Sequence, residues 1–170
     1  MTPVVIVSHG LHSSPDATKA AALAEVAQGM GWTCLRPDYR DLDAVGEIGD
    51  VAARIERLKR LARDVDAPLV LAGSSMGAFV SARVSLKVAT RGLFLMAPPV
   101  QLRGQQIQLE AAAVPTWIVH GWHDELIPAV EVVRWAQARG DRLLLVDDSH
   151  RLAAHEQCCA DEFGRFLEGL

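Results

Sequence analysis

The sequence predicts an α/β protein, in which a mostly parallel sheet of six strands is covered by helices on both faces. Short apolar runs alternate along the chain with longer segments of helical periodicity, which is the pattern of successive strand-helix-strand units. The chain has 170 residues and contains no internal repeat, low-complexity segment or linker, so we expect one domain over residues 1–170. The expected strands lie at residues 3–8, 32–36, 68–72, 92–96, 115–119 and 142–147.

Helix boundaries and apolar stripes predict the helices between and after these strands. Ser14-Pro15-Asp16 has the capping hydroxyl, the proline and the acid typical of a helix start, and Gly29 ends that helix. A second helix is expected at residues 51–65, where apolar residues recur at helical spacing. Further helices are expected at about 77–88, 128–138 and 151–167.

Residues 97–114 form the one irregular excursion of the predicted fold. They contain Pro98-Pro99 and a glutamine-rich stretch, and we expect one short helix that ends at residues 110–113. The segment is too short for a lid domain, and the sequence leaves open whether it moves as a flap.

The composition permits a compact enzyme. Hydrophobic residues make up 50% of the chain and charged residues 22%, which argues against disorder. The formal net charge is -4, and no basic stripe stands out, so nucleic acid is not expected as a partner. One basic cluster is interrupted by acids and is therefore interpreted as a solvated helix face. It consists of Arg54, Arg57, Lys59, Arg60 and Arg63.

The sequence indicates neither a membrane nor an oxidising compartment. No stretch approaches 18 apolar residues, and residues 1–10 lack a basic leader, so they are interpreted as a strand rather than a signal peptide. Cys34, Cys158 and Cys159 are an odd set without ligand spacing, and the last two are interpreted as packing residues. We therefore expect a cytoplasmic protein without a membrane partner.

The motif Gly73-Ser-Ser-Met-Gly77 lies between an apolar run and a helical stretch, the setting in which G-x-S-x-G makes a nucleophile. A serine at the tip of such a turn takes a strained backbone, and glycines two positions on either side let strand and helix approach. Ser75 is therefore the nucleophile candidate. Ser74 is not, because Ala72 and Met76 would occupy the glycine positions. Alone, the motif also fits an ordinary Gly/Ser-rich turn.

Two further residues accompany the motif. Asp124 and His150 follow Ser75, each just past an apolar run, in the order Ser, Asp, His. Alone, Asp124 would be a helix-capping acid, and Glu125 could take its place. Asp148 precedes His150 on the same loop and is interpreted as a turn or cap residue.

Taken together, these residues resemble a small, cap-less member of the α/β-hydrolase superfamily, of the serine esterase kind. The resemblance covers nearly the whole chain and rests on residues 7–10, 73–77, 120–128 and 148–150. It implies a reduced α/β-hydrolase fold with strand order 2-1-3-4-5-6 and no cap domain. The antiparallel strands that begin the larger members are missing from the sequence.

The family order places the strands before Ser75 and Asp124 two positions apart, about 10 Å, which an imidazole bridges with two hydrogen bonds. The resemblance thus implies Ser75 as nucleophile, His150 as base and acid, and Asp124 as the acid that orients it. It also implies an oxyanion hole formed by the backbone N–H groups of Met76 and Leu11.

The substrate is expected to contact residues that follow the strands at their carboxyl ends. For each of these positions, a loop residue packed into the core is the alternative. The expected pocket residues are Gly10, His12, Pro98, Trp122 and Ile127.

No metal or other cofactor is expected. His9, His12, His120 and His123 form two H-x-x-H pairs, but both lie at strand ends, where a spacing of three does not bring side chains onto one face. In the family order the two strands are three positions apart, about 14 Å, which is too far for one ion. The sequence also lacks a G-x-G-x-x-G or Walker loop.

Three functions from different classes remain open. The leading hypothesis is hydrolysis of small carboxylic esters through an acyl-enzyme. The same residues would serve a thioesterase, an amidase or an acyltransferase. A non-catalytic binding module on this fold is the third. The sequence leaves open the physiological substrate and the oligomeric state.

Overall fold

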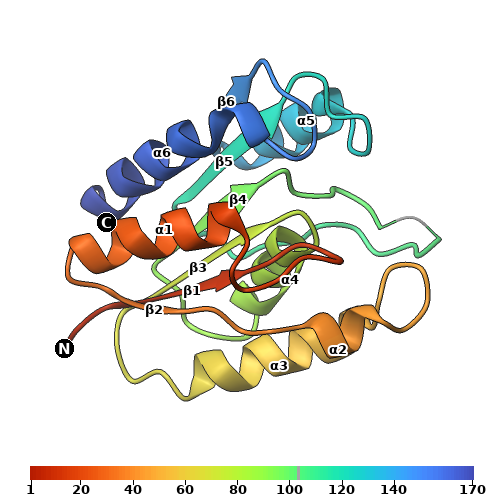
Figure 1. Ribbon diagram of the computed structural model, residues 1–170. Helices are drawn as coiled ribbons and strands as arrows, with labels where there is room; N and C mark the ends of the chain where they lie inside the picture. Colours follow the sequence, from red (N-terminus) through yellow and green to blue (C-terminus); the bar gives the residue numbers. More distant parts are fainter. Residues whose placement is uncertain (103) are drawn as a thin grey trace.

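Six parallel strands form the centre of the fold, which a computed structural model describes at residues 1–102 and 104–170. The strands are β1 (Val4–Ser8), β2 (Thr33–Leu35), β3 (Leu69–Ser74), β4 (Gly92–Met96), β5 (Thr116–Gly121) and β6 (Arg142–Val146). They lie in the order β2-β1-β3-β4-β5-β6, and each neighbouring pair is parallel. This arrangement, drawn in Figure 1, confirms the predicted fold class.

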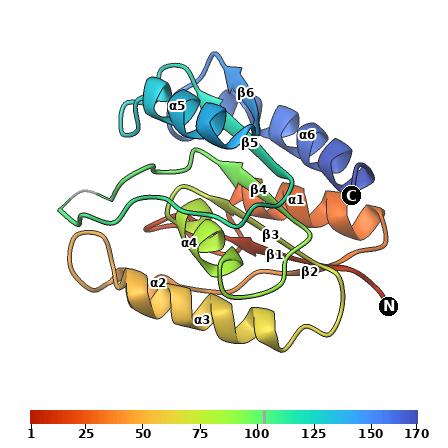
Figure 2. The same ribbon diagram turned by 180° about the vertical axis from the view of Figure 1, so that it is seen from behind.

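Helices cover both faces of the sheet. They are α1 (Thr18–Gly29), α2 (Arg40–Asp43), α3 (Val51–Arg63), α4 (Met76–Ser85), α5 (Ala129–Arg139) and α6 (Glu156–Glu168), with a short 3-10 helix η1 (Ala153–His155) before the last. Residues of α1 and α6 pack into one core cluster, and residues of α3, α4 and α5 pack into the other. Helices α1 and α6 cross the near side of the sheet in Figure 1, and α4 and α5 lie nearest in the reversed view of Figure 2.

The strands are apolar on both faces because both faces are covered. In β1 the side chains alternate, so that Val4 and Ile6 join the cluster of α3, α4 and α5, while Val5 and Val7 join that of α1 and α6. The same alternation holds in β3 and β4. Continuous apolar runs of this kind are typical of parallel sheets, and they made the central strands predictable.

The helices differ from the prediction most clearly in three places. Helix α1 begins at Thr18 rather than at Ser14, because the Ser14 hydroxyl accepts the Asp16 N–H and closes a turn ahead of the helix. Helix α2 is an additional element of four residues. The last helix is split, because Leu152 has a left-handed backbone with φ 54° and only η1 and α6 follow it.

The excursion at residues 97–114 contains no helix in its described part, so the predicted short helix is wrong. Gln101 and Gln108 instead form an isolated antiparallel bridge. Helix α5 binds the second half of this excursion. Trp135 donates a hydrogen bond to the carbonyl of Leu109, and Arg139 donates to the carbonyls of Ala111 and Ala112. Side-chain donors on α5 replace the hydrogen bonds that a helix would have made.

Loops from β1, β3, β5 and β6 emerge at the carboxyl edge of the sheet, where ligands bind in open α/β folds. In the described part of the chain, no helix has the length and apolarity that a membrane crossing needs.

Candidate active site

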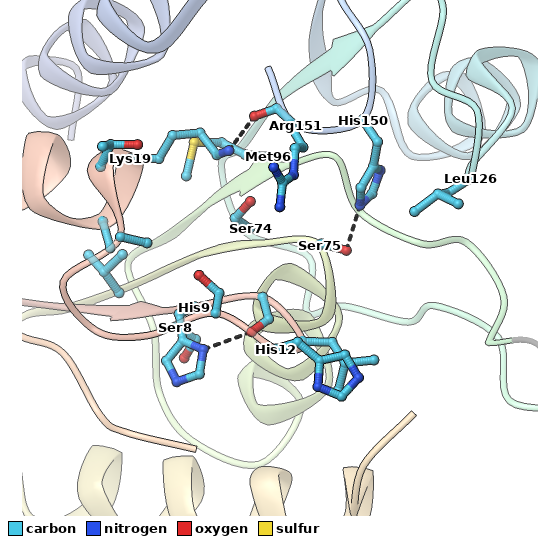
Figure 3. Close-up of a pocket in the computed structure, with 17 residues that line it drawn as sticks. Ser8, His9, His12, Lys19, Ser74, Ser75, Met96, Leu126, His150 and Arg151 are labelled. Atoms are coloured by element: carbon cyan, nitrogen blue, oxygen red, sulfur yellow. Dashed lines mark hydrogen bonds between the residues drawn. The ribbon is translucent and has the colours of Figure 1, made fainter. Parts of the chain in front are cut away.

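Ser75 lies in the sharp turn between β3 and α4. Its backbone has φ 52° and ψ -118°, a region that residues with a side chain rarely adopt. The turn is fixed by a 2.9 Å hydrogen bond from the Ser75 N–H to the carbonyl of Met96 at the end of β4. Figure 3 shows the hydroxyl directed toward His150. The strain therefore serves to hold one side chain clear of strand and helix.

The two glycines of the motif are required by close backbone contacts. A Cβ at Gly73 would lie 2.4 Å from the carbonyl carbon and oxygen of Gly77. A Cβ at Gly77 would lie 2.0 Å from the carbonyl oxygen of Ser8 in β1. Real Cβ atoms do not approach backbone so closely, and this close fit between α4 and its two strands explains the spacing of the motif.

Ser75, His150 and Asp124 form one chain of hydrogen bonds. The Ser75 Oγ lies 2.9 Å from His150 Nε2, and His150 Nδ1 lies 2.7 Å from Asp124 Oδ2. Because a carboxylate only accepts, Nδ1 carries the proton, and in the neutral ring Nε2 is free to accept the serine hydroxyl. The structure thus brings the three residues singled out in the sequence within hydrogen-bonding distance.

Asp124 is buried and is held from both sides. Its Oδ1 accepts the backbone N–H groups of Leu126 and Ile127 at 2.9 and 2.7 Å. Burial alone would raise the pKa of this carboxyl, but the hydrogen bonds from His150, Ile127 and Leu126 outweigh it and lower the pKa below its ordinary value. Asp124 is therefore ionised at neutral pH and cannot rotate away from the imidazole.

His120, at the end of β5, packs against the same carboxylate. Its Nε2 donates to the carbonyl of Ile127 at 3.0 Å and lies 3.3 Å from Asp124 Oδ2. Burial lowers its pKa, with the hydrogen bond to Ile127 and the nearby Asp124 opposing this only in part. A neutral His120 ring places no second positive charge beside the Asp124 carboxylate.

His150 reaches the serine because its loop lies directly against the end of β5. A Cβ at Gly121 would lie 2.4 Å from the carbonyl oxygen of Asp148 and 2.7 Å from that of Ser149. The His150 N–H donates to Glu125 Oε2 at 3.1 Å, which ties the loop to the turn after β5. Glu125, the alternative acid from the sequence, thus binds the backbone of His150, while Asp148 accepts hydrogen bonds from Ser149, Ala154 and His155.

The loop after β1 is held from beneath by Arg54 of α3. This guanidinium is fully buried and donates to the carbonyl oxygens of His9 and Gly10 at 2.9 and 3.1 Å. It also binds both carboxylate oxygens of Asp43 in α2, at 2.7 and 2.6 Å. The interpretation of Arg54 as part of a solvated helix face was wrong, because a buried carboxylate and two carbonyls replace its water.

His9 and Tyr39 complete the support of this loop. His9 Nδ1 donates to the carbonyl of Gly10 at 2.7 Å, and its Nε2 accepts the Tyr39 N–H at 3.0 Å. Burial lowers the pKa of His9, and the hydrogen bond to Gly10 opposes this only in part. Arg54 also lies over the Tyr39 ring, 4.5 Å from its centroid. All three side chains fix the backbone of the loop.

A cavity of about 410 Å³ opens beside Ser75, between the loop after β1, the start of α1 and the His150 loop. This is within the usual size range of small-molecule sites. Figure 3 shows the side chains around it. The residues that line it are Val7, Ser8, His9, Gly10, Leu11, His12, Ser13, Ala17, Thr18, Lys19, Ala20, Ser74, Ser75, Met96, Leu126, His150 and Arg151.

Only part of the expected pocket lines this cavity. Gly10 and His12 do, whereas Pro98, Trp122 and Ile127 do not. Pro98 and Ile127 are buried, and Trp122, in the turn after β5, is 57% exposed. The sequence analysis placed these three by the strand ends that they follow, whereas this cavity lies on the side of α1.

Lys19 and Arg151 line the cavity and escaped the sequence analysis. Arg151 directly follows His150, so its position beside Ser75 could have been inferred from the motif. Lys19 could not, because its approach depends on how α1 packs beside the His150 loop. Lys19 Nζ donates to the carbonyl of Arg151.

The described residues include no group of three or more His, Cys, Asp and Glu side chains placed to hold a metal ion. Of the histidine pairs, His12 lines the cavity, and His123 binds Asp147 at the surface at 2.9 Å.

Comparison with solved structures gives full-length matches. A protein from Xanthomonas campestris pv. campestris, described as a hydrolase of the α/β superfamily, is 54% identical, with a TM-score of 0.96 over 98% of this chain and 99% of that one. An α/β serine hydrolase homologue from Coxiella burnetii is 25% identical, with a TM-score of 0.75 over 98% of this chain and 85% of that one.

A third structure shows the fold alone. It is a lidless α/β serine hydrolase from Xanthomonas campestris, 22% identical, with a TM-score of 0.75 over 98% of this chain and 81% of that one. No family model and no curated protein matches the sequence. The structural relatives support hydrolase activity. At 54% identity over essentially the full length of both proteins, the chain belongs to the α/β-hydrolase superfamily, as a small member without a cap.

Proposed function

We propose that this protein is a serine hydrolase that cleaves small carboxylic esters through an acyl-enzyme on Ser75. The observation that carries the proposal is the pair of hydrogen bonds from Ser75 through His150 to Asp124, 2.9 and 2.7 Å long, beside a cavity. A nucleophile, a base and an acid that orients the base are what acyl transfer requires. The kinship with α/β hydrolases supports the same reaction type.

In the first half of the reaction, Ser75 Oγ attacks the carbonyl carbon while His150 Nε2 takes its proton. Asp124 stabilises the resulting imidazolium. The imidazolium then gives its proton to the alcohol oxygen as the ester C–O bond breaks, which leaves the acyl group on Ser75. In the second half, water attacks the acyl carbon and gives a proton to His150, which returns it to Ser75 Oγ as the acid leaves. Ester and water become acid and alcohol.

The oxyanion would be bound by the backbone N–H groups of Met76 and Leu11. Met76 begins α4, and its N–H adds the positive end of the helix dipole. Among the described residues, neither N–H donates to a backbone or side-chain acceptor. Both are thus available to a ligand.

The direction of the Leu11 N–H follows from its peptide group. Because Arg54 and His9 bind the Gly10 carbonyl and the peptide is trans, the Leu11 N–H points the opposite way. A Cβ at Gly10 would lie 3.6 Å from that of Ser75, so the loop passes close to the nucleophile. Arg54 is therefore proposed to position this donor without touching the substrate.

We expect a preference for short acyl chains. The cavity of about 410 Å³ has no cap above it to enclose a long chain. Each buried methylene contributes about 0.8 kcal/mol and each exposed one almost nothing. The rate should therefore level off or fall beyond butyryl esters, and a steady rise in kcat/KM toward long chains would contradict this.

A fluorophosphonate probe tests the nucleophile. The wild-type protein should be labelled on Ser75, and Ser75→Ala should lose labelling and several orders of magnitude in ester turnover. Ser74→Ala is the matched control, because Ser74 also lines the cavity. The Ser74→Ala protein should keep most of its labelling and ester turnover. If the Ser74 variant is inactive and the Ser75 variant active, the turn has been misassigned.

A substrate panel separates the alternatives that share these residues. Esters, thioesters and anilides with the same acyl group should be compared, with and without an added alcohol as acyl acceptor. The proposal expects ester hydrolysis to be fastest. Faster thioester or anilide cleavage would assign a thioesterase or an amidase, and transfer to the alcohol in place of hydrolysis would assign an acyltransferase. If the fluorophosphonate probe does not label the protein and no substrate is turned over, a non-catalytic binding module is the function that remains.

A further inference from the structure

The cavity beside Ser75 is positively charged although the protein as a whole is negative. Its lining includes Lys19 and Arg151 but no aspartate or glutamate. The chain has 21 acidic and 17 basic residues, so the sign of this lining is opposite to that of the chain as a whole. A site with cations alone attracts negative groups and repels positive ones.

Arg151 has an unused guanidinium at this cavity. It directly follows His150, is exposed, and has no hydrogen-bond acceptor or carboxylate partner among the described residues. Figure 3 shows its guanidinium extending into the cavity between Ser74 and His150. Two parallel N–H groups of a guanidinium match the two oxygens of a carboxylate or phosphate.

Lys19 fixes the backbone from which Arg151 projects. Its ammonium donates to the Arg151 carbonyl, and an ammonium has two further protons to donate. Burial lowers the pKa of Lys19, with Cys159 and Glu156 opposing this only in part. A negative group in the cavity would offset this desolvation.

The acids nearest the cavity already have partners. Asp124 binds His150 and two backbone N–H groups, and Glu156 accepts the Thr18 hydroxyl. Asp43 is bound by Arg54 behind the loop after β1. Glu125 borders a separate hollow on the other side of Leu126. None of them is directed at the Arg151 guanidinium.

We propose that this site prefers esters that carry a negatively charged group, a carboxylate or a phosphate, which Arg151 binds with Lys19 beside it. The inference rests on the proposed ester hydrolysis and adds the substrate class. The charge can lie on the acyl part or on the alcohol part of the ester. In either arrangement the ester carbonyl can still lie next to Ser75.

Two substrate pairs test the two positions of the charge. On the alcohol side, 4-acetoxybenzoate is compared with the neutral 4-acetoxybenzamide. On the acyl side, the mono-4-nitrophenyl ester of adipic acid is compared with 4-nitrophenyl hexanoate. The measured quantity is the ratio of kcat/KM for the anionic to the neutral ester, corrected for spontaneous hydrolysis. Comparing this ratio between variants cancels both intrinsic reactivity and the amount of folded enzyme.

In at least one pair, Arg151→Met should lower this ratio about tenfold or more, as expected for the loss of a charged hydrogen bond. Lys19→Met should lower it less, and Arg151→Lys should keep part of it. Added salt should lower the wild-type ratio. The control is Arg134→Met, which removes the same charge from the exposed side of α5, outside the cavity, and should leave the ratio unchanged.

The outcomes separate the two proposals. Hydrolysis of the neutral esters with the same ratio in the wild type and in Arg151→Met would overturn the anion preference alone. An equal fall in Arg134→Met would overturn it too, because it would show an effect of net charge. No turnover of any ester by the wild-type protein would overturn the proposed function and this inference with it.

Discussion

The guanidinium of Arg54 binds the carboxylate of Asp43 through two hydrogen bonds, 2.7 and 2.6 Å long, and both side chains are buried. Its other hydrogen bonds go to the carbonyl oxygens of His9 and Gly10, in the loop that carries the proposed oxyanion donor. An ion pair between two helices thereby sets the direction of a peptide group beside Ser75.

Arg54→Met should lower kcat by a factor on the order of a hundred, with a smaller change in KM, because it frees the Leu11 peptide to rotate. It should also destabilise the fold by about 3–5 kcal/mol, because the buried Asp43 carboxylate loses its charged partner and keeps only the His12 N–H. Ester kinetics and urea unfolding measure the two effects.

The double variant Arg54→Met with Asp43→Leu separates these effects. An apolar pair should restore much of the stability but not kcat. Arg57→Met, on the same helix and paired with Asp41 at the surface, is the control and should keep both. A double variant as active as the wild type would refute the positioning role.

Asp124→Asn should lower kcat by a factor on the order of ten thousand. The asparagine oxygen can still accept the N–H groups of Leu126 and Ile127, which turns its NH2 group toward His150. His150 must then present its protonated nitrogen to Ser75, and the base is lost. Pre-steady-state ester kinetics measure the effect. Asp148→Asn, on the loop of His150, is the control and should keep its activity. An inactive Asp148→Asn beside an active Asp124→Asn would assign the orienting acid to Asp148 instead.

Gly77→Ala should destabilise the protein by about 3 kcal/mol or more, because the new methyl group would lie 2.0 Å from the Ser8 carbonyl oxygen. Helix α4 would have to move away from β1. Gly29→Ala is the matched control, since a Cβ there meets nothing within 4 Å and alanine favours the helix. Thermal unfolding should give a lower melting temperature for Gly77→Ala than for Gly29→Ala. Equal melting temperatures would show that the fold tolerates a methyl group next to the Ser8 carbonyl.

Stability should fall as the pH drops below about 6.5. The pKa values of His9 and His120 are lowered from 6.5 by burial, so in the window below 6.5 the unfolded chain binds protons that the folded chain does not. This contribution is complete above pH 6.5 and is lost toward the lowered pKa values. Asp124 adds a similar loss at lower pH, because its pKa lies below 3.8.

Urea unfolding between pH 5 and 8 measures this dependence, which amounts to at most about 1.4 kcal/mol per pH unit for each histidine. In the His120→Gln variant, the free energy of unfolding should change less steeply with pH than in the wild type. A wild-type midpoint that stays constant across this range would contradict the neutral state of the two rings.

The residues of the candidate site were predictable from the sequence because each follows a strand. Parallel strands end at one edge, so Ser75, Asp124 and His150 had to meet once the strand order was known. Arg54 was harder. Its spacing from Val51 and Leu58 places it on the apolar stripe, but its partner Asp43 lies in a four-residue helix that has no periodicity to recognise.

The cavity was the least predictable part. Its walls come from the packing of α1 beside the His150 loop, and no local pattern encodes the contact between Lys19 and Arg151, 132 residues apart. Ser14 shows a related difficulty, because its hydroxyl serves a turn and a helix start equally well and only the final packing decides.

The backbone of Ser75, with φ 52° and ψ -118°, has a consequence for engineering. A side chain in this region costs about 1–3 kcal/mol, which glycine would not incur. A library screened for heat resistance alone would therefore enrich Ser75→Gly. Given the nucleophile role proposed for Ser75, the most robust clones would be the inactive ones. Thermostable variants of this enzyme have to be selected with turnover as a second criterion at every round.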